Sequence, residues 1–240
     1  MKQNIYNDPV FFESYKELRE NDTGLNEEIE IPAFRKLIDN IENSTVLDLG
    51  CGFGSQLQFL LDQKAKEVIG VDISGRMINE AKKGIRSGKI KLICTAIEDY
   101  RIEPGKFDIV LSSMTFHYIK DLDPVLENVY NGLKTGGQFI FSIEHPVCTA
   151  LLEDWVETEK GKIWSVARYS QEGIRYQNWF VPGVKKYHRK ISTLIDSLIA
   201  TGFKICSVEE PEPPRNILKK RPDLSGHMER PPILIIKSEK

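Results

Sequence analysis

The sequence lacks the features of a metal-binding, disulfide-bonded or membrane-spanning protein. Its four cysteines lie far apart and form no CxxC pair, which argues against a zinc motif and a disulfide framework. No run reaches the ~18 apolar residues of a membrane span, and the polar N-terminus has no apolar stretch typical of a signal peptide. We therefore expect a cytoplasmic protein with reduced thiols, no metal ion and no membrane span.

An excess of charge of either sign is also missing. The 33 basic and 35 acidic residues give a net charge of -2, so the sequence as a whole has no electrostatic reason to bind nucleic acid. A chain of 240 residues, 40% of them hydrophobic, is typical of one globular domain with room for a small inserted cap. No internal repeat or interdomain linker divides it. We expect a single domain over residues 1–240, and the sequence leaves its oligomeric state open.

The sequence does contain a regular alternation of strand and helix patterns. Short apolar runs typical of strands alternate with helical patterns whose apolar residues share one face. The predicted strands are 46–49, 67–72, 91–94, 107–111, 138–143, 203–208 and 233–237. Strands joined through helices form right-handed crossovers, so the pattern predicts a doubly wound α/β fold around a seven-stranded, mostly parallel sheet.

The alternation stops after the fifth strand and resumes with a helix near 192–201. We interpret residues 145–190 as an insertion, and it holds all three tryptophans, Trp155, Trp164 and Trp179. Aromatic side chains beside a ligand site favour a substrate cap, and the alternative is the aromatic core of a small extra subdomain. The stretch between the last two strands holds six of the twelve prolines and predicts a long loop.

A glycine-rich turn follows the first strand, at the edge of the sheet where open α/β proteins bind ligands. It contains Gly50, Gly52 and Gly54, and a missing Cβ lets the backbone approach a ligand closely. Asp72 ends the second strand, where nucleotide-binding sheets place an acid that accepts hydrogen bonds from ribose hydroxyls. The adenosine of NAD or of S-adenosylmethionine satisfies this pattern.

Two details favour S-adenosylmethionine over the dinucleotide. The glycine spacing is GxGxG, whereas the dinucleotide fingerprint is GxGxxG with a helix N-terminus open to pyrophosphate. Asp48 stands just before the glycines, where a carboxylate repels pyrophosphate but suits a ligand with an ammonium and a sulfonium. We therefore favour a methyltransferase. The alternatives are an NAD-dependent oxidoreductase and a non-catalytic protein that binds S-adenosylmethionine.

Residues 46–54 resemble the first motif of class I S-adenosylmethionine-dependent methyltransferases, and the resemblance continues through 68–74, 107–113 and 133–137. It covers about half of the chain, and the small-molecule branch that includes ubiquinone and menaquinone biosynthesis enzymes is the most similar. The resemblance implies a Rossmann-like fold with an antiparallel last strand, N-terminal helices over the cofactor in 1–43, and a substrate cap in 145–190. It also implies S-adenosyl-L-homocysteine as the product of the cofactor.

The resemblance further implies which residues contact the cofactor. Asp48 and the glycine turn would line the methionine portion, Asp72 would bind the ribose, and Arg19 suits the cofactor carboxylate, although a solvated surface arginine is the alternative. Ala96 stands where the family often has an aspartate, so the adenine edge would meet groups near it. The full set of expected cofactor contacts is Tyr15, Arg19, Asp48, Gly50, Cys51, Gly52, Gly54, Asp72, Ile73, Met77, Ala96, Ile97, Glu98 and Ser112.

Other residues are predicted to contact the methyl acceptor. They follow the fourth and fifth strands or belong to the insertion: Ser113, Phe116, His117, Glu144, Trp179 and Tyr187. His145 and His188 lie at the two ends of the insertion. They are the candidate general bases, because imidazole gains and loses its proton near neutral pH. A hydroxyl or carbon acceptor needs such a base, and a carboxylate or amine acceptor needs none.

The acceptor itself is expected to be a small molecule. The chain has neither the catalytic cysteine–proline pair nor the Asn-Pro-Pro-aromatic tetrapeptide of DNA methyltransferases, and its charge is nearly neutral. Methyl transfer is an in-line displacement, so the main task of the protein is to align the acceptor atom, the methyl group and the sulfur.

Overall fold

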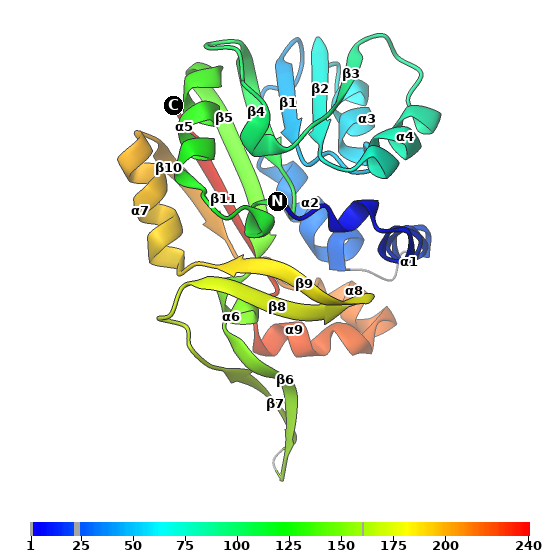
Figure 1. Cartoon of the computed structure of the whole chain (residues 1–240), viewed down its shortest axis with the longest axis vertical. Helices are drawn as coiled ribbons and strands as arrows, with labels where there is room; N and C mark the ends of the chain where they lie inside the picture. The colour runs from blue at the N-terminus through cyan, green and yellow to red at the C-terminus, as the bar shows by residue number, and fades with distance from the viewer. Residues whose placement is uncertain (1, 22–24, 160) are drawn as a thin grey trace.

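Seven strands form one twisted sheet in the computed structural model, which describes residues 2–21, 25–159 and 161–240, with the side chains of 151–155 outside the described part. The strand order is β10-β11-β5-β4-β1-β2-β3 (Figure 1). The strands are β1 (Thr45–Leu49), β2 (Glu67–Asp72), β3 (Ile90–Cys94), β4 (Phe107–Ser112), β5 (Leu133–Glu144), β10 (Lys204–Glu209) and β11 (Ile233–Glu239). β11 pairs antiparallel with both of its neighbours, β5 and β10, and the other strand pairs of this sheet are parallel. The predicted doubly wound fold with an antiparallel last strand is confirmed.

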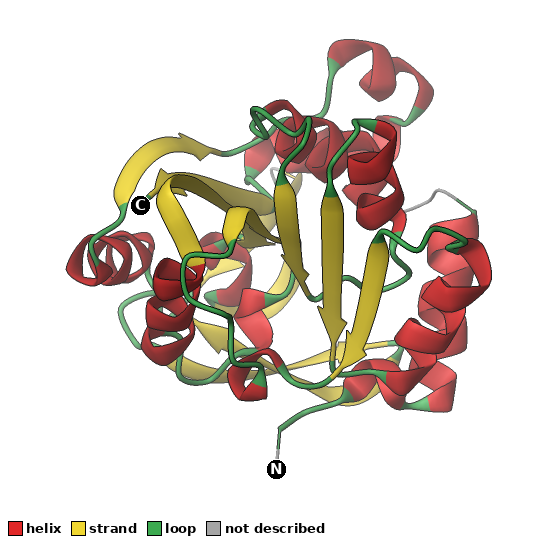
Figure 2. Cartoon of the chain, turned by 90° about the horizontal axis from the view of Figure 1, so that it is seen from above, coloured by secondary structure: helices red, strands yellow, loops and turns green. Residues whose placement is uncertain are grey.

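Helices cover both faces of the sheet (Figure 2). On one face lie α2 (Ile31–Lys36), α3 (Ser55–Asp62) and α4 (Gly75–Gly84), and on the other lie α5 (Asp123–Gly132) and α7 (Ile191–Thr201). Side chains alternate between the faces along each strand, so Val46 joins the first apolar core and Leu47 the second. Burial on both sides explains why these strands are almost continuously apolar.

The ends of the helices follow the local sequence signals. The Ser74 hydroxyl accepts a hydrogen bond from the Met77 N–H at 3.3 Å and caps α4. Gly202 ends α7 with a φ of 107°, a left-handed conformation that glycine adopts without strain. Serine and glycine are the residue types that these two kinds of helix end favour. The cap fixes where α4 begins, directly after the end of β2.

Helices replace the long loop predicted between the last two strands. They are α8 (Arg215–Lys220), a 3-10 turn (Pro222–Ser225) and α9 (Gly226–Glu229). Pro214 and Pro222 lie at the start of such elements, where the missing N–H and fixed φ of proline cost nothing. Two of the six prolines of this segment therefore begin helical elements, and the prediction of a long loop is wrong.

The insertion forms a short helix and two antiparallel hairpins. They are α6 (Pro146–Thr149), β6 (Leu151–Thr158) with β7 (Gly161–Val166), and β8 (Gly173–Trp179) with β9 (Val181–His188). The β8–β9 hairpin crosses the edge of the sheet below the helix α1 (Pro9–Glu20) (Figure 1). Its tip packs against this helix, with ring centroids of Trp179 and Phe180 at 5.1 and 5.4 Å from that of Phe11. Among the described residues, no helix is long and apolar enough to cross a membrane.

Candidate active site

A cavity of about 1580 Å³ lies at the carboxyl ends of the strands. Its wall is built from the glycine turn after β1, the end of β2, the loops after β3 and β4, the N-terminal segment and the β8–β9 hairpin. Ligands of open α/β sheets bind at this edge. The volume exceeds the ~1000 Å³ upper range of ordinary ligand pockets, so two molecules fit side by side.

The three glycines of the turn have different tasks. Gly50, Gly52 and Gly54 have φ values of 89°, 52° and 80°. A Cβ on Gly50 would lie 2.2 Å from the Thr115 hydroxyl oxygen, whereas a Cβ on Gly52 would meet no protein atom within 4 Å. Gly52 therefore offers bare backbone to the cavity. A Cβ on Gly54 would meet Ile85, and Gly54 is not part of the cavity wall, so its expected contact with the cofactor stays a prediction without support from the cavity.

Asp72 joins the glycine turn to the start of α4. One carboxylate oxygen accepts a hydrogen bond from the Gly52 N–H at 3.0 Å and the other accepts one from the Ser74 N–H at 2.8 Å. Burial raises the pKa of Asp72, and the two backbone hydrogen bonds oppose this rise. The carboxylate lines the cavity and keeps free lone pairs for further donors. This geometry fits a pair of ribose hydroxyls.

Asp48 is a buried carboxylate whose Oδ1 atom has no hydrogen-bond partner among the described residues. The residue is 2% exposed and lines the cavity. Burial, followed by the nearby charges of Asp72 and Glu30, raises its pKa to about 7. An orphaned buried carboxylate is costly, and a cationic group on a ligand relieves that cost. The site therefore fits the positively charged methionine portion of S-adenosylmethionine.

The residues expected around the adenine share one wall of the cavity. Ile73, Met77, Ala96, Ile97 and Glu98 all line it. Four of them are apolar and suit a purine face, while Glu98 lies in the middle of the short 3-10 turn Ile97–Asp99. Their direct contact with the cofactor stays a prediction.

The N-terminal segment supplies a second wall. Tyr15 and Arg19, one turn apart on α1, both line the cavity as expected. Tyr15 stacks near the Phe53 ring at 5.8 Å between centroids. The Arg19 guanidinium pairs with the Glu27 carboxylate at 2.5 Å, and its side chain is 16% exposed. Arg19 is therefore held at the cavity by an acid of its own segment, and its contact with a ligand carboxylate stays a prediction.

The acceptor side is only partly as expected. Ser113, His117, Glu144, Trp179 and Tyr187 line the cavity. Their contact with an acceptor stays a prediction, because the cavity wall shows only where they lie. They come from the loop after β4, the end of β5 and the β8–β9 hairpin, segments far apart in the sequence.

The side chains of two other expected contact residues, Ser112 and Phe116, lie away from the cavity. Ser112 is fully buried, and its hydroxyl donates a hydrogen bond to the Leu49 carbonyl at 2.8 Å, which ties β4 to β1. Phe116 packs in the core against Phe139 and Phe141, with centroids 5.8 and 5.5 Å away. Neither residue belongs to the wall of the large cavity.

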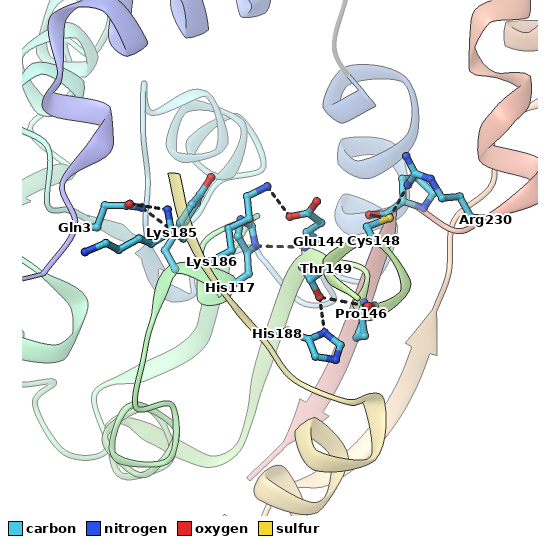
Figure 3. Close-up of polar contacts among 12 residues, drawn as sticks. Gln3, His117, Glu144, Pro146, Cys148, Thr149, Lys185, Lys186, His188 and Arg230 are labelled. Carbon is cyan, nitrogen blue, oxygen red and sulfur yellow. Dashed lines mark hydrogen bonds and ion pairs between the residues drawn. The ribbon is translucent and has the colours of Figure 1, made fainter. Parts of the chain in front are cut away.

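Both candidate bases make structural contacts. His145 and His188 are each 1% exposed and lie outside the cavity wall. The His145 Nε2 atom is 2.7 Å from the Glu210 carboxylate, and its Nδ1 atom accepts the Val147 N–H. The His188 Nδ1 atom lies 2.7 Å from the Thr149 hydroxyl oxygen (Figure 3). Its Nε2 atom lies 2.8 Å from the Tyr169 carbonyl oxygen. Both ring nitrogens of each imidazole are thus engaged away from the cavity, so this geometry does not favour a histidine base, and the catalytic role stays a prediction.

The cavity also contains charged residues that the sequence did not single out. The Lys186 ammonium pairs with Glu144 at 2.6 Å in a largely buried contact (Figure 3), and the Arg230 guanidinium lies 3.9 Å from the Trp164 ring centroid. Lys186 belongs to β9 and Arg230 to the loop before β11. Among these residues, only Glu144 had a position in the sequence, at the end of a predicted strand, that pointed to the site. Lys186 in the insertion and Arg230 in the loop before β11 stand in no recognisable spacing.

We expect His145→Ala and His188→Ala to destabilise the fold by about 1–3 kcal/mol each, because each leaves buried polar partners without a hydrogen bond. Binding of S-adenosylhomocysteine should stay unchanged, since neither imidazole faces the cavity. Urea unfolding and calorimetric titration measure the two effects. Weakened binding at full stability would restore the histidines to the site.

Together, the parallel sheet, the glycine turn, the ribose-directed Asp72 and the unpaired Asp48 define a protein that binds an adenosine cofactor with a cationic tail. Residues 47–141 match the family model of a methyltransferase domain. A solved structure from Mesorhizobium loti, an S-adenosylmethionine-dependent methyltransferase, is 32% identical over 90% of this chain and 100% of that chain, with a TM-score of 0.86. The chain belongs to the family of S-adenosylmethionine-dependent methyltransferases, and S-adenosylmethionine is its cofactor.

Two further relatives extend the comparison. A solved structure from Listeria monocytogenes, assigned to the same class, is 42% identical over 88% of this chain and 96% of that chain, with a TM-score of 0.83. A malonyl-[acyl-carrier protein] O-methyltransferase from Priestia megaterium is 36% identical over 40% of this chain and 35% of that protein. The two solved structures thus match most of this chain, whereas this last relative matches less than half of it.

Proposed function

We propose that the protein transfers a methyl group from S-adenosylmethionine to a small-molecule acceptor bound in the same cavity. The observation that carries this proposal is the continuity of the cavity, which runs from the glycine turn to the β8–β9 hairpin. Its hairpin wall contains Tyr176, Trp179 and Tyr187, aromatic side chains that suit a compact organic ligand. A wall made by a hairpin that packs on α1 favours an enclosed acceptor over the surface of a macromolecule.

In this proposal the cofactor lies across the ends of β1, β2 and β3. Asp72 accepts hydrogen bonds from the ribose hydroxyls, and Ile73 and Met77 pack on the adenine beside Ala96 and Ile97. Asp48 faces the methionine ammonium. The Gly50, Cys51 and Gly52 backbone lies along the methionine, while Tyr15 and Arg19 close over it, with Arg19 suited to its carboxylate.

The sulfonium of the cofactor supplies an electrophilic methyl group, and the chain supplies alignment. Rate acceleration by orientation requires that the acceptor atom be held in line with the methyl carbon and the sulfur. Trp179 and Tyr15, whose rings contact edge to face at 5.9 Å, join the hairpin to α1 and exclude water from that line. Neither His145 nor His188 lines the cavity, and the Nδ1 atom of His117, which does line it, already accepts the Glu144 N–H at 3.3 Å. In this proposal catalysis therefore rests on alignment.

Cofactor binding should release a proton from Asp48 near neutral pH. Its pKa of about 7 in the ligand-free protein lies above the unfolded value of 3.8, so the stability of the ligand-free fold falls as pH rises between these values. An ammonium beside Asp48 lowers this pKa, which makes binding stronger as pH rises toward 7 and level above it.

We expect release of about one proton per bound S-adenosylhomocysteine at pH 6 and almost none at pH 8. Calorimetric titration in phosphate and in imidazole, which both buffer from pH 6 to 8, measures the released proton through the heat of buffer ionisation. Asp48→Asn removes the titrating group and should remove the difference between the buffers. Equal proton release by wild type and Asp48→Asn would place the titration on another residue.

Methyl transfer to a cell extract tests the proposal itself. The purified protein is incubated with S-adenosylmethionine carrying a tritium-labelled methyl group, and the products are separated by ultrafiltration. We expect enzyme-dependent label in the small-molecule filtrate. Label that stays with protein or nucleic acid would contradict a small-molecule acceptor.

A further inference from the structure

Glu30 is a buried carboxylate that the sequence analysis did not single out. It ends the π-helical turn Asn26–Glu30, directly before α2, and is 1% exposed. Its Oε1 atom accepts hydrogen bonds from the hydroxyl groups of Ser113 at 2.8 Å and Ser142 at 2.6 Å. The Ser142 hydroxyl also accepts the Met114 N–H at 2.9 Å. These bonds tie the N-terminal segment to the ends of β4 and β5.

The second carboxylate oxygen of Glu30 is different. Oε2 is buried and has no hydrogen-bond partner among the described residues, and the side chain lines the cavity. Asp48 Oδ1 is likewise buried without a hydrogen-bond partner among the described residues, and Asp48 lines the same cavity. The charge of Glu30 is one of the causes that raise the pKa of Asp48. Two unpaired carboxylate oxygens that line one cavity and repel each other are costly together, and a cation between them would relieve both.

The nearby basic side chains of the described chain are already engaged. The Arg19 guanidinium pairs with Glu27, a different acid of the same segment. The Arg35 guanidinium donates to the Gln56 amide oxygen and lies 4.1 Å from the centre of the Phe59 ring. No ion pair between Glu30 or Asp48 and a basic residue occurs within the part of the chain that the structure describes. The charge of Arg19 acts on Glu30 only from a distance, so a cation supplied by a ligand would be the first to pair with these oxygens directly.

We propose that Glu30 and Asp48 together bind the ammonium of the cofactor's methionine portion. An ammonium has three N–H donors, so Glu30 Oε2 and Asp48 Oδ1 each take one. The two serines hold Oε1 and so fix the direction of Oε2. Glu30 thus makes the N-terminal segment, which lies outside the matched methyltransferase domain of residues 47–141, selective for ligands that carry the amino group.

This inference rests on the proposed placement of the methionine portion beside Asp48, and its test separates the two. The probes are S-adenosylhomocysteine and its deamino analogue, in which hydrogen replaces the amino group, each titrated calorimetrically into the full-length protein. The variant is Glu30→Gln, which keeps the size and the serine contacts of the side chain but removes its charge. Glu28→Gln removes a charge two residues away and is the matched control.

We expect Glu30→Gln to weaken S-adenosylhomocysteine by at least about tenfold, because a charged hydrogen bond to the ammonium is lost. Binding of the deamino analogue should change by less than about twofold, and Glu28→Gln should leave both ligands unchanged. If Glu30→Gln does not fold, Glu30→Asp, which keeps the charge but withdraws it from the site, should show the same selective loss.

Two results would overturn the proposal. One is wild-type affinity for S-adenosylhomocysteine in Glu30→Gln, and the other is an equal loss for both ligands, which would indicate a structural role. Failure of the wild-type protein to bind S-adenosylhomocysteine at all is a distinct outcome, since it would contradict the cofactor site rather than the role of Glu30.

Discussion

Gly52→Ala should lose most of its affinity for S-adenosylhomocysteine while the fold stays nearly as stable. A Cβ at this position has no protein atom within 4 Å and enters the cavity where the proposed methionine portion lies. Steric exclusion of the ligand by a methyl group should cost on the order of 3 kcal/mol, or about 100-fold in affinity. The left-handed φ of 52° adds a strain of roughly 1–2 kcal/mol to the stability.

Gly136→Ala is the matched control for this experiment. Gly136 also has a left-handed φ, of 74°, and a Cβ there also meets no atom within 4 Å, but the residue lies outside the cavity wall. Its alanine variant should show the same loss of stability in urea and wild-type binding in a calorimetric titration. A Gly52→Ala protein that binds like wild type would remove the ligand from the glycine turn.

Asp72→Ala should weaken both S-adenosylhomocysteine and adenosine, in contrast to Glu30→Gln. The substitution leaves two ribose hydroxyls without a charged acceptor and frees the Gly52 and Ser74 N–H groups that hold the turn. We expect a loss on the order of 1–3 kcal/mol, or about 10- to 100-fold, for each ligand. Calorimetric titration measures both, with Asp62→Ala, an acid outside the cavity wall, as the control. Unchanged affinity would show that Asp72 does not contact the ribose.

The fold and the cofactor side of the cavity were accessible from the sequence because local signals determine them. A strand that ends in glycines must turn sharply, and the first residue after a parallel strand lies at the ligand-binding edge. This reasoning placed Asp48, Gly52 and Asp72 on the cavity wall. It did not separate Gly54, whose missing Cβ makes room for Ile85 rather than for a ligand, since spacing alone does not show what a glycine approaches.

The acceptor side was less predictable because it depends on where side chains point. Ser112 and Phe116 stand at the expected edge, yet one bonds the neighbouring strand and the other enters the core. His145 and His188 lie at the two ends of the insertion as predicted. However, the His145 ring contacts Glu210, 65 residues away, and the His188 ring contacts Thr149, 39 residues away. Proximity of the backbone to a site did not determine the direction of the imidazoles.

Glu30 was missed for a different reason. It lies in an acidic stretch, Glu27 to Glu30, that reads as a solvated surface, and the two serines that bury it come from β5 and from the loop after β4. Pairings across 83 and 112 residues have no local sequence signal. Tertiary contacts of this kind appear only once the segments are packed together.

The melting temperature of the purified protein with and without ligand shows whether the cavity binds S-adenosylmethionine rather than NAD. A ligand that binds only the folded state raises the melting temperature by mass action. We expect S-adenosylmethionine and S-adenosylhomocysteine each to raise the melting temperature in proportion to the logarithm of their concentration, and NAD to leave it unchanged. Stabilisation by NAD, with no effect of either sulfur ligand, would contradict a cofactor site for S-adenosylmethionine.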